Sequence, residues 1–128
     1  MTLSLTPAVL VAVGGLAGSV ARYWLSGIVQ SFAGAGFPSG TLVVNVLGSF
    51  VIGLVMSLSL DRGLLRDDLR ILLTTGFCGG FTTMSTFSYE TLALLRDGER
   101  LLALGNAGGT FAACMVAVWV GDLFAHIL

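Results

Sequence analysis

Long apolar stretches, separated by short polar segments, dominate the pattern of this chain. Stretches free of Asp, Glu, Lys and Arg extend over residues 1–21, 23–60, 71–89 and 101–121. A membrane-spanning helix needs about twenty predominantly apolar residues, and the second stretch has room for the end of one such helix and the whole of another. The pattern predicts an all-α membrane protein with four transmembrane helices near residues 5–30, 39–60, 67–95 and 99–126. They form a single transmembrane domain over residues 1–128.

The composition supports a membrane protein rather than a soluble one. Hydrophobic residues make up 55% of the chain and charged residues 10%, with a mean hydropathy of +0.96. About a quarter of a typical soluble domain is charged. No basic segment precedes the first apolar stretch, so we do not expect a cleaved signal peptide. Both cysteines, Cys78 and Cys114, fall inside predicted helices, where we expect free thiols rather than a disulfide.

The chain carries none of the patterns that an enzyme or a nucleic-acid-binding protein requires. No nucleophile is paired with a base, no cysteine or histidine cluster has the spacing of metal ligands, and no nucleotide loop or basic patch occurs. The single histidine, His126, stands alone, and we assign it no function. We therefore expect neither an enzyme nor a nucleic-acid partner.

The arginines are divided almost evenly between the two sides of the membrane. Four spans place the second connection, which carries Arg62, Arg66 and Arg70, opposite the third, which carries Arg96 and Arg100. Arg22 lies towards the same side as the third connection, so the tally is three against three, or three against two without it. Because orientation follows an excess of Lys and Arg on one side, this balance predicts insertion in both orientations and an antiparallel homodimer.

Small residues in the predicted helices indicate close packing. Gly14 and Gly18 have the small-xxx-small spacing that lets two helix backbones approach each other in a membrane. Most such glycines are expected to pack within one subunit. Four short spans nevertheless leave little room for a polar pathway, so we expect some of the contacts to join two subunits.

The segment from Gly76 to Glu90 places glycines, hydroxyls and a carboxylate between apolar flanks. Glycine weakens a helix, so we expect Gly76, Gly79 and Gly80 to interrupt the third span, with the break at Gly79-Gly80. Carbonyl groups freed at membrane depth must meet protein, water or an ion. The sequence therefore predicts an ion or solute site at this break.

Hydroxyl groups follow the predicted break. Ser85 and Ser88 share one helix face, as do Thr86 and Glu90. A row of hydroxyls can replace the hydration of an ion step by step, and the positive edge of the nearby Phe87 ring can meet an anion. The alternative is that the hydroxyls bond back to carbonyls of their own helix.

Two further polar residues lie in the predicted spans, and each of them has two possible roles. Asn45 either forms an interhelical hydrogen bond or presents its amide to a passing anion. Arg22, beside an aromatic pair, either anchors the helix at the membrane surface or faces a vestibule and attracts anions. The residues by themselves do not decide between these roles.

With these motifs the chain resembles the Fluc (CrcB) family of fluoride channels over essentially its full length. The matching pieces are the glycines and Arg22-Tyr23 of the first span, Gly40-Thr41-Leu42 with Asn45 in the second, and the segment from Gly76 to Glu90. The resemblance implies a multi-pass protein of the bacterial plasma (inner) membrane that exports toxic cytoplasmic fluoride passively. It also implies four-span subunits that form antiparallel dimers with two pores.

The resemblance assigns roles to individual residues. The backbone carbonyls of Gly79 and Thr82 would bind a structural Na⁺ at the dimer interface, in keeping with the preference of hard cations for oxygen. Arg22 would lie at the vestibule, and Thr86 and Glu90 would support the hydroxyl track. The fluoride pathway itself would be lined by Asn45, Met84, Ser85, Phe87, Ser88 and Thr110.

One position departs from the family pattern, and one rival function shares the four-span antiparallel architecture. Met84 stands where the family usually has a first phenylalanine, and a thioether has no ring edge to present to an anion. The rival is a small dual-topology multidrug exporter that couples drug export to protons. It requires an acidic residue in the middle of the first span, which this chain lacks.

Overall fold

The computed structural model describes residues 5–128, so residues 1–4 of the predicted domain lie outside it. Within the described part there are helices and no strands. Three helices are long and apolar enough to cross a membrane: α1 (Leu5–Ala33), α2 (Ser39–Leu60) and α6 (Arg100–Ile127). The remaining predicted span is divided into α3 (Asp67–Ile71), the π-helix η1 (Leu72–Cys78), α4 (Gly79–Phe81) and α5 (Met84–Arg96).

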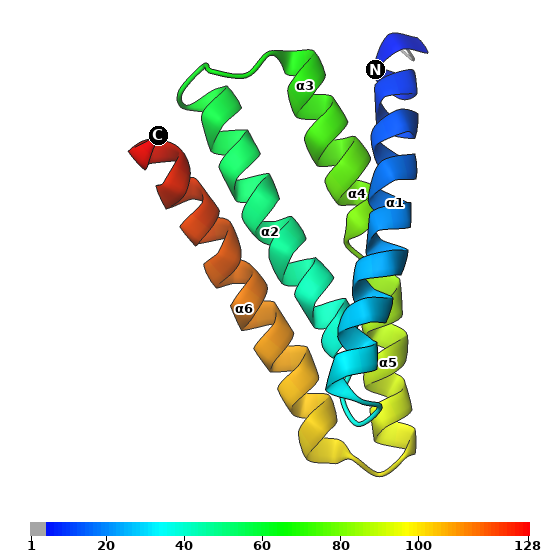
Figure 1. Cartoon of the computed structure of the whole chain (residues 1–128). Coiled ribbons are helices and arrows are strands. Elements are labelled where there is room, and N and C mark those ends of the chain that lie inside the picture. Colours follow the sequence, from blue (N-terminus) through cyan, green and yellow to red (C-terminus); the bar gives the residue numbers. More distant parts are fainter. Residues whose placement is uncertain (1–4) are drawn as a thin grey trace.

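The helices run up and down along one another (Figure 1). The helices α2 and α6 pack along each other, while η1 and α4 pack along α1. The start of α1, the end of α2, the start of α3 and the end of α6 gather at one end of the molecule (Figure 1). Short connections therefore place each apolar segment beside the next in antiparallel order.

The predicted break of the third segment is confirmed, but its predicted position is wrong. The chain remains helical through Gly79 and Gly80, and the extended residues are Thr82 (φ −96°, ψ 159°) and Thr83 (φ −152°, ψ 115°). The glycines serve close packing instead. A Cβ atom on Gly80 would lie 2.5 Å from the Gly15 carbonyl oxygen and 3.0 Å from the Ser19 nitrogen. Only glycine fits at this position, because a side chain would overlap the neighbouring backbone.

The loop between α1 and α2 is held by one glutamine. Gly34, with φ +86°, ends α1 in a conformation that glycine adopts without strain. Gln30 then spans the loop, because its Nε2 donates to the Phe37 carbonyl at 2.9 Å and its Oε1 accepts from the Gly40 N–H at 3.1 Å. The first residues of α2 are thereby positioned next to the end of α1.

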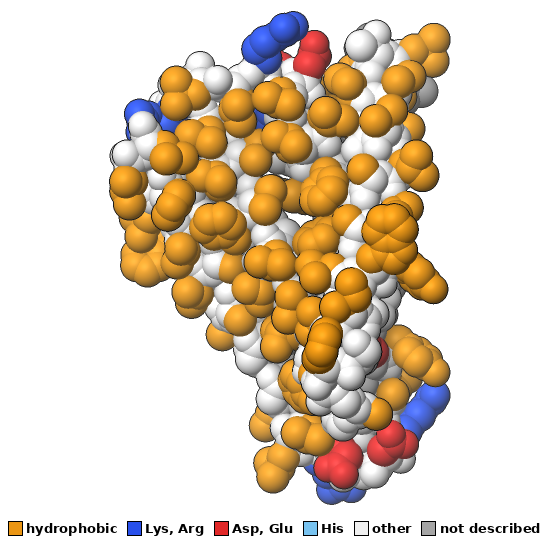
Figure 2. Space-filling model, in the orientation of Figure 1, with side chains coloured by type: hydrophobic (Ala, Val, Ile, Leu, Met, Phe, Trp, Pro, Cys, Tyr) orange, Lys and Arg blue, Asp and Glu red, His pale blue; other side chains and the backbone are white. Residues whose placement is uncertain are grey.

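The outer surface is apolar, as a lipid-facing surface requires. Large hydrophobic side chains such as Leu16, Trp24 and Phe111 are more than 60% exposed, whereas the most buried positions include Val44, Ala103 and Asn106. Figure 2 shows hydrophobic side chains over the middle of this face and charged side chains gathered towards its two ends. The hydrocarbon region of a bilayer accommodates such a band.

Candidate functional site

The break in the third segment is held open by the side chain of Asn45 on α2. The Asn45 Oδ1 accepts the Thr83 N–H at 2.8 Å, and its Nδ2 donates to the Thr83 carbonyl at 3.1 Å. Both polar groups of this residue are thus satisfied across the helix interface, where hydrocarbon offers no partner. The interhelical alternative for Asn45 is therefore present in the structure, and the second hydrogen of its Nδ2 is left for another acceptor.

The bonds at the break redirect two N–H groups away from carbonyls of the same helix. In a continuous helix the Thr83 N–H would bond to Gly79 and the Thr86 N–H to Thr82. Here the Thr83 N–H goes to Asn45, and the Thr86 N–H goes to the Thr83 hydroxyl at 3.2 Å, which caps the start of α5. The carbonyl oxygens of Gly79 and Thr82 consequently keep lone pairs available to a ligand.

Arg22 lies against the same break. Its Nε donates to the Gly80 carbonyl at 2.9 Å, and its side chain is only partly buried. The arginine thus satisfies a third carbonyl that the interrupted helix leaves open. Its predicted role at a vestibule stays a prediction.

A groove of about 1040 Å³ opens beside the break, between α2, η1 and α6. Its walls combine apolar side chains with hydroxyls and one amide. Such polar groups can replace part of the hydration shell of an ion that crosses the membrane. Six of the predicted site residues line it: Asn45, Gly79, Thr82, Met84, Phe87 and Thr110.

The remaining predicted residues lie outside this groove. Ser85 and Ser88 are exposed on α5, and the Ser88 hydroxyl donates to the Met84 carbonyl at 2.8 Å, the local bond considered above as the alternative. Thr86 is bonded to the Thr83 hydroxyl at 3.0 Å. Glu90 accepts a hydrogen bond from the buried Thr41 hydroxyl at 2.5 Å.

The structure also reveals a buried polar group that the sequence analysis missed. Asn106 on α6 is 2% exposed, donates its Nδ2 to the Thr91 hydroxyl at 2.9 Å and accepts from the Thr110 hydroxyl at 3.2 Å. An amide within an apolar stretch is the same signal that singled out Asn45. This chain of bonds orients Thr110 at the groove wall and links α6 to α5.

Comparison with known proteins gives consistent matches. The family model described as CrcB-like protein, Camphor Resistance (CrcB), matches residues 9–122. The fluoride-specific ion channel FluC of Geobacter sulfurreducens is 50% identical over 124 residues, which cover 97% of this chain and 100% of that protein. The protein of the same name from Chlorobaculum tepidum is 51% identical over 92% of this chain and 93% of its own length. That of Pelobacter propionicus is 48% identical over 100% and 96%.

Proposed function

The chain belongs to the CrcB family, and from this we propose that it is a fluoride-selective channel of the plasma membrane that lets cytoplasmic fluoride leave the cell passively. The observation that carries the proposal is the 50% identity, over 97% of the chain, to a protein named a fluoride-specific ion channel. The groove between apolar helices supports it, because a channel requires polar groups at membrane depth. The protein is a channel and not an enzyme.

The residues of the groove suit a small, strongly hydrated anion. A hydrogen-bond donor can replace part of the hydration shell of such an ion, and the unused hydrogen of the Asn45 amide is one such donor. The Thr110 hydroxyl also lines the groove, and it would become a second donor by releasing the hydrogen that it gives to the Asn106 Oδ1. Phe87 lies at the groove and offers the positive edge of its ring. Met84 contributes a flexible, polarisable surface in place of a second ring.

We infer that the pathway is completed by a second copy of the chain. Ser85 and Ser88 lie on an exposed face of α5, away from the groove of their own subunit, and Met84 is 72% exposed. Hydroxyls facing lipid are unfavourable, and a partner that covers α5 would remove this cost. We propose that the divided segment from α3 to α5 is a fourth crossing and that two subunits pair in antiparallel orientation, as the balanced arginines favour.

A structural Na⁺ fits the free carbonyls of the break. Hard cations bind backbone carbonyl oxygens, and Gly79 and Thr82 have carbonyls whose usual helical donors bond elsewhere. Gly79 is exposed in the single chain, so its carbonyl is accessible to a second subunit. We propose that these carbonyls hold Na⁺ at the interface, where the ion would supply positive charge and join the two subunits.

The decisive experiment compares anion efflux from liposomes that contain the purified protein. We expect rapid passive fluoride efflux and chloride efflux at least a hundredfold slower. Equal chloride flux, or uphill movement that depends on a proton gradient, would contradict a fluoride channel. The second outcome would indicate proton-coupled transport, the mechanism of the multidrug exporter, which α1 disfavours because its residues include no Asp or Glu.

A further inference from the structure

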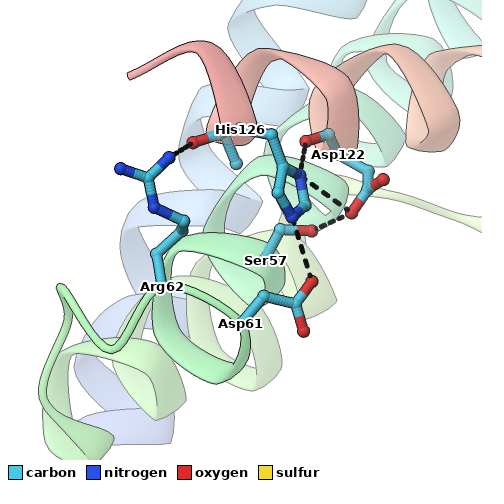
Figure 3. Close-up of polar contacts among 6 residues, drawn as sticks. Ser57, Asp61, Arg62, Asp122 and His126 are labelled. Atoms are coloured by element: carbon cyan, nitrogen blue, oxygen red, sulfur yellow. Dashed lines mark hydrogen bonds and ion pairs between the residues drawn. The ribbon is translucent and has the colours of Figure 1, made fainter.

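A second polar site lies away from the groove, where the C-terminal ends of α2 and α6 meet (Figure 3). Asp61 caps the end of α2, and Asp122 and His126 lie one turn apart on α6. One ligand atom from each of these residues lies within 4.8 Å of the others. The pathway proposed above uses none of the three, so the inference does not rest on the fluoride channel.

The imidazole of His126 is oriented by a backbone hydrogen bond. Its Nδ1 lies 2.8 Å from the Asp122 carbonyl oxygen, which can only accept, so Nδ1 carries the hydrogen. In neutral imidazole this leaves Nε2 with a free lone pair, and Nε2 lies 3.6 Å from the Asp61 Oδ2. Histidines that bind metals are typically fixed in this way, with one ring nitrogen bonded to a carbonyl and the other facing the ion.

The carboxylates of Asp61 and Asp122 are also available to bind a cation. The Ser57 hydroxyl donates to the Asp122 Oδ1, which holds that carboxylate in place. The neighbouring Arg62 bonds through its Nη1 to the Ala125 carbonyl at 3.0 Å and forms no ion pair with either aspartate among the described residues. Two carboxylates therefore face one imidazole ring, and no arginine pairs with either of them among the described residues.

The distances favour a metal ion over a proton shared between the ring and the carboxylates. The His126 Nε2 lies 3.6 Å from the Asp61 Oδ2, and its Nδ1 lies 3.8 Å from the Asp122 Oδ1; both distances exceed a charge-assisted hydrogen bond of about 2.8 Å. Ligands of an ion with bonds near 2.1 Å lie about 3.0–3.4 Å from one another, and one ligand atom from each of the three residues already lies within 4.8 Å of the others; side-chain rotations would bring these atoms to bonding distance. The three side chains are 41–55% exposed, which leaves the site open to ions from solution.

We propose that Asp61, Asp122 and His126 form a binding site for a divalent transition-metal ion such as Zn²⁺ or Co²⁺. One imidazole nitrogen and two carboxylates are a donor set that these ions accept. Water completes the coordination, because no further His, Cys, Asp or Glu joins this group among the described residues. The bound ion cross-links the ends of α2 and α6 and so opposes their separation.

The test is a Co²⁺ titration of the full chain, purified in detergent without a polyhistidine tag and freed of metal with a chelator. We expect visible absorption from one bound Co²⁺ per chain, displaced by Zn²⁺. His126→Gln and Asp61→Asn should each weaken Co²⁺ binding at least tenfold. The matched control is Glu99→Gln, an exposed acid at the other end of α6, which should bind Co²⁺ as the unaltered protein does.

Two results would overturn the proposal. One is the absence of saturable Co²⁺ binding, or equal binding by the unaltered protein and His126→Gln. The other is that His126→Gln lowers thermal stability at pH 5.5 but not at pH 8, with no Co²⁺ bound at either pH, since this pattern belongs to a proton-dependent ion pair alone. Asp61→Asn gives an independent reading of the site if His126→Gln does not fold.

Discussion

The close approach of α1 to the third segment predicts a large effect from one added methyl group. Gly18 faces the turn that leads into α4. A Cβ atom at Gly18 would lie 2.9 Å from the Phe77 carbonyl carbon and 3.0 Å from the Phe81 nitrogen, and closer still to the Phe77 carbonyl oxygen. All of these are backbone atoms, so no change of side-chain rotamer relieves the overlap. Gly18→Ala must instead push α1 away from the segment that carries the helix break.

The magnitude follows from the size of the overlap. Carbon atoms in contact prefer separations of about 3.5–4.0 Å, so the two helices would have to move apart by at least about 0.5 Å along their contact. Overpacking of this kind costs about 1–3 kcal/mol, and we expect the upper half of that range because backbone cannot yield locally. The displacement also lengthens the bond between Arg22 and Gly80, which is 2.9 Å in the native arrangement.

The same helix supplies a matched control. Gly27 also lies in α1, but a Cβ atom there would meet nothing within 4 Å. Gly27→Ala should be neutral or stabilising, because alanine favours a helix by about 1 kcal/mol over glycine in peptides. Reversible unfolding in mixed detergent micelles would measure both variants, and liposome efflux would report the effect on fluoride. If Gly18→Ala unfolds within about 0.5 kcal/mol of Gly27→Ala, well below the cost of overpacking, the packing argument is refuted.

Three further predictions concern the site. Asn45→Ala removes both bonds at the helix break and should cost about 1–3 kcal/mol and at least tenfold in fluoride efflux. The control Ser31→Ala removes only a local bond to the Ile28 carbonyl at the exposed end of α1 and should change little; equal effects would contradict the role of Asn45. Glu90→Gln keeps an acceptor for Thr41, so efflux should stay within about threefold, while Glu90→Ala should lower stability by about 1 kcal/mol in thermal unfolding. Met84→Phe should be tolerated because the side chain is 72% exposed, and a dead channel in the efflux assay would contradict this.

Much of the fold could be predicted from the sequence, because a helix that spans the hydrocarbon layer needs about twenty apolar residues. The predicted spans near 39–60 and 99–126 correspond to α2 (Ser39–Leu60) and α6 (Arg100–Ile127), within one residue at each end. The π-helix at Leu72–Cys78 was not predicted, since no local pattern distinguishes it from an α-helix. Asn45 and the hydroxyl-rich segment stood out for the same physical reason, namely that polar groups in hydrocarbon need partners.

The helix break shows what the sequence did not decide. Glycines suggested Gly79-Gly80, yet the break lies at Thr82 and Thr83 because a side chain 38 residues away bonds to the Thr83 backbone. A bond between residues so far apart leaves no local signature. The sequence also did not show which hydroxyls line the groove: Thr110 lines it, whereas Ser85 and Ser88 are exposed on α5.

The sequence by itself showed that lipid surrounds the protein, how many apolar segments it has and which few polar residues lie among them. Hydrophobicity and segment length can be read from the order of residues alone. The tertiary structure decided which partner each polar group has. It showed that Arg22 donates a hydrogen bond to the Gly80 carbonyl, and it placed the solitary His126 beside Asp61, which is far from it in sequence. These outcomes depend on how the helices are arranged in space, and the hydrophobic pattern does not specify which atoms then meet.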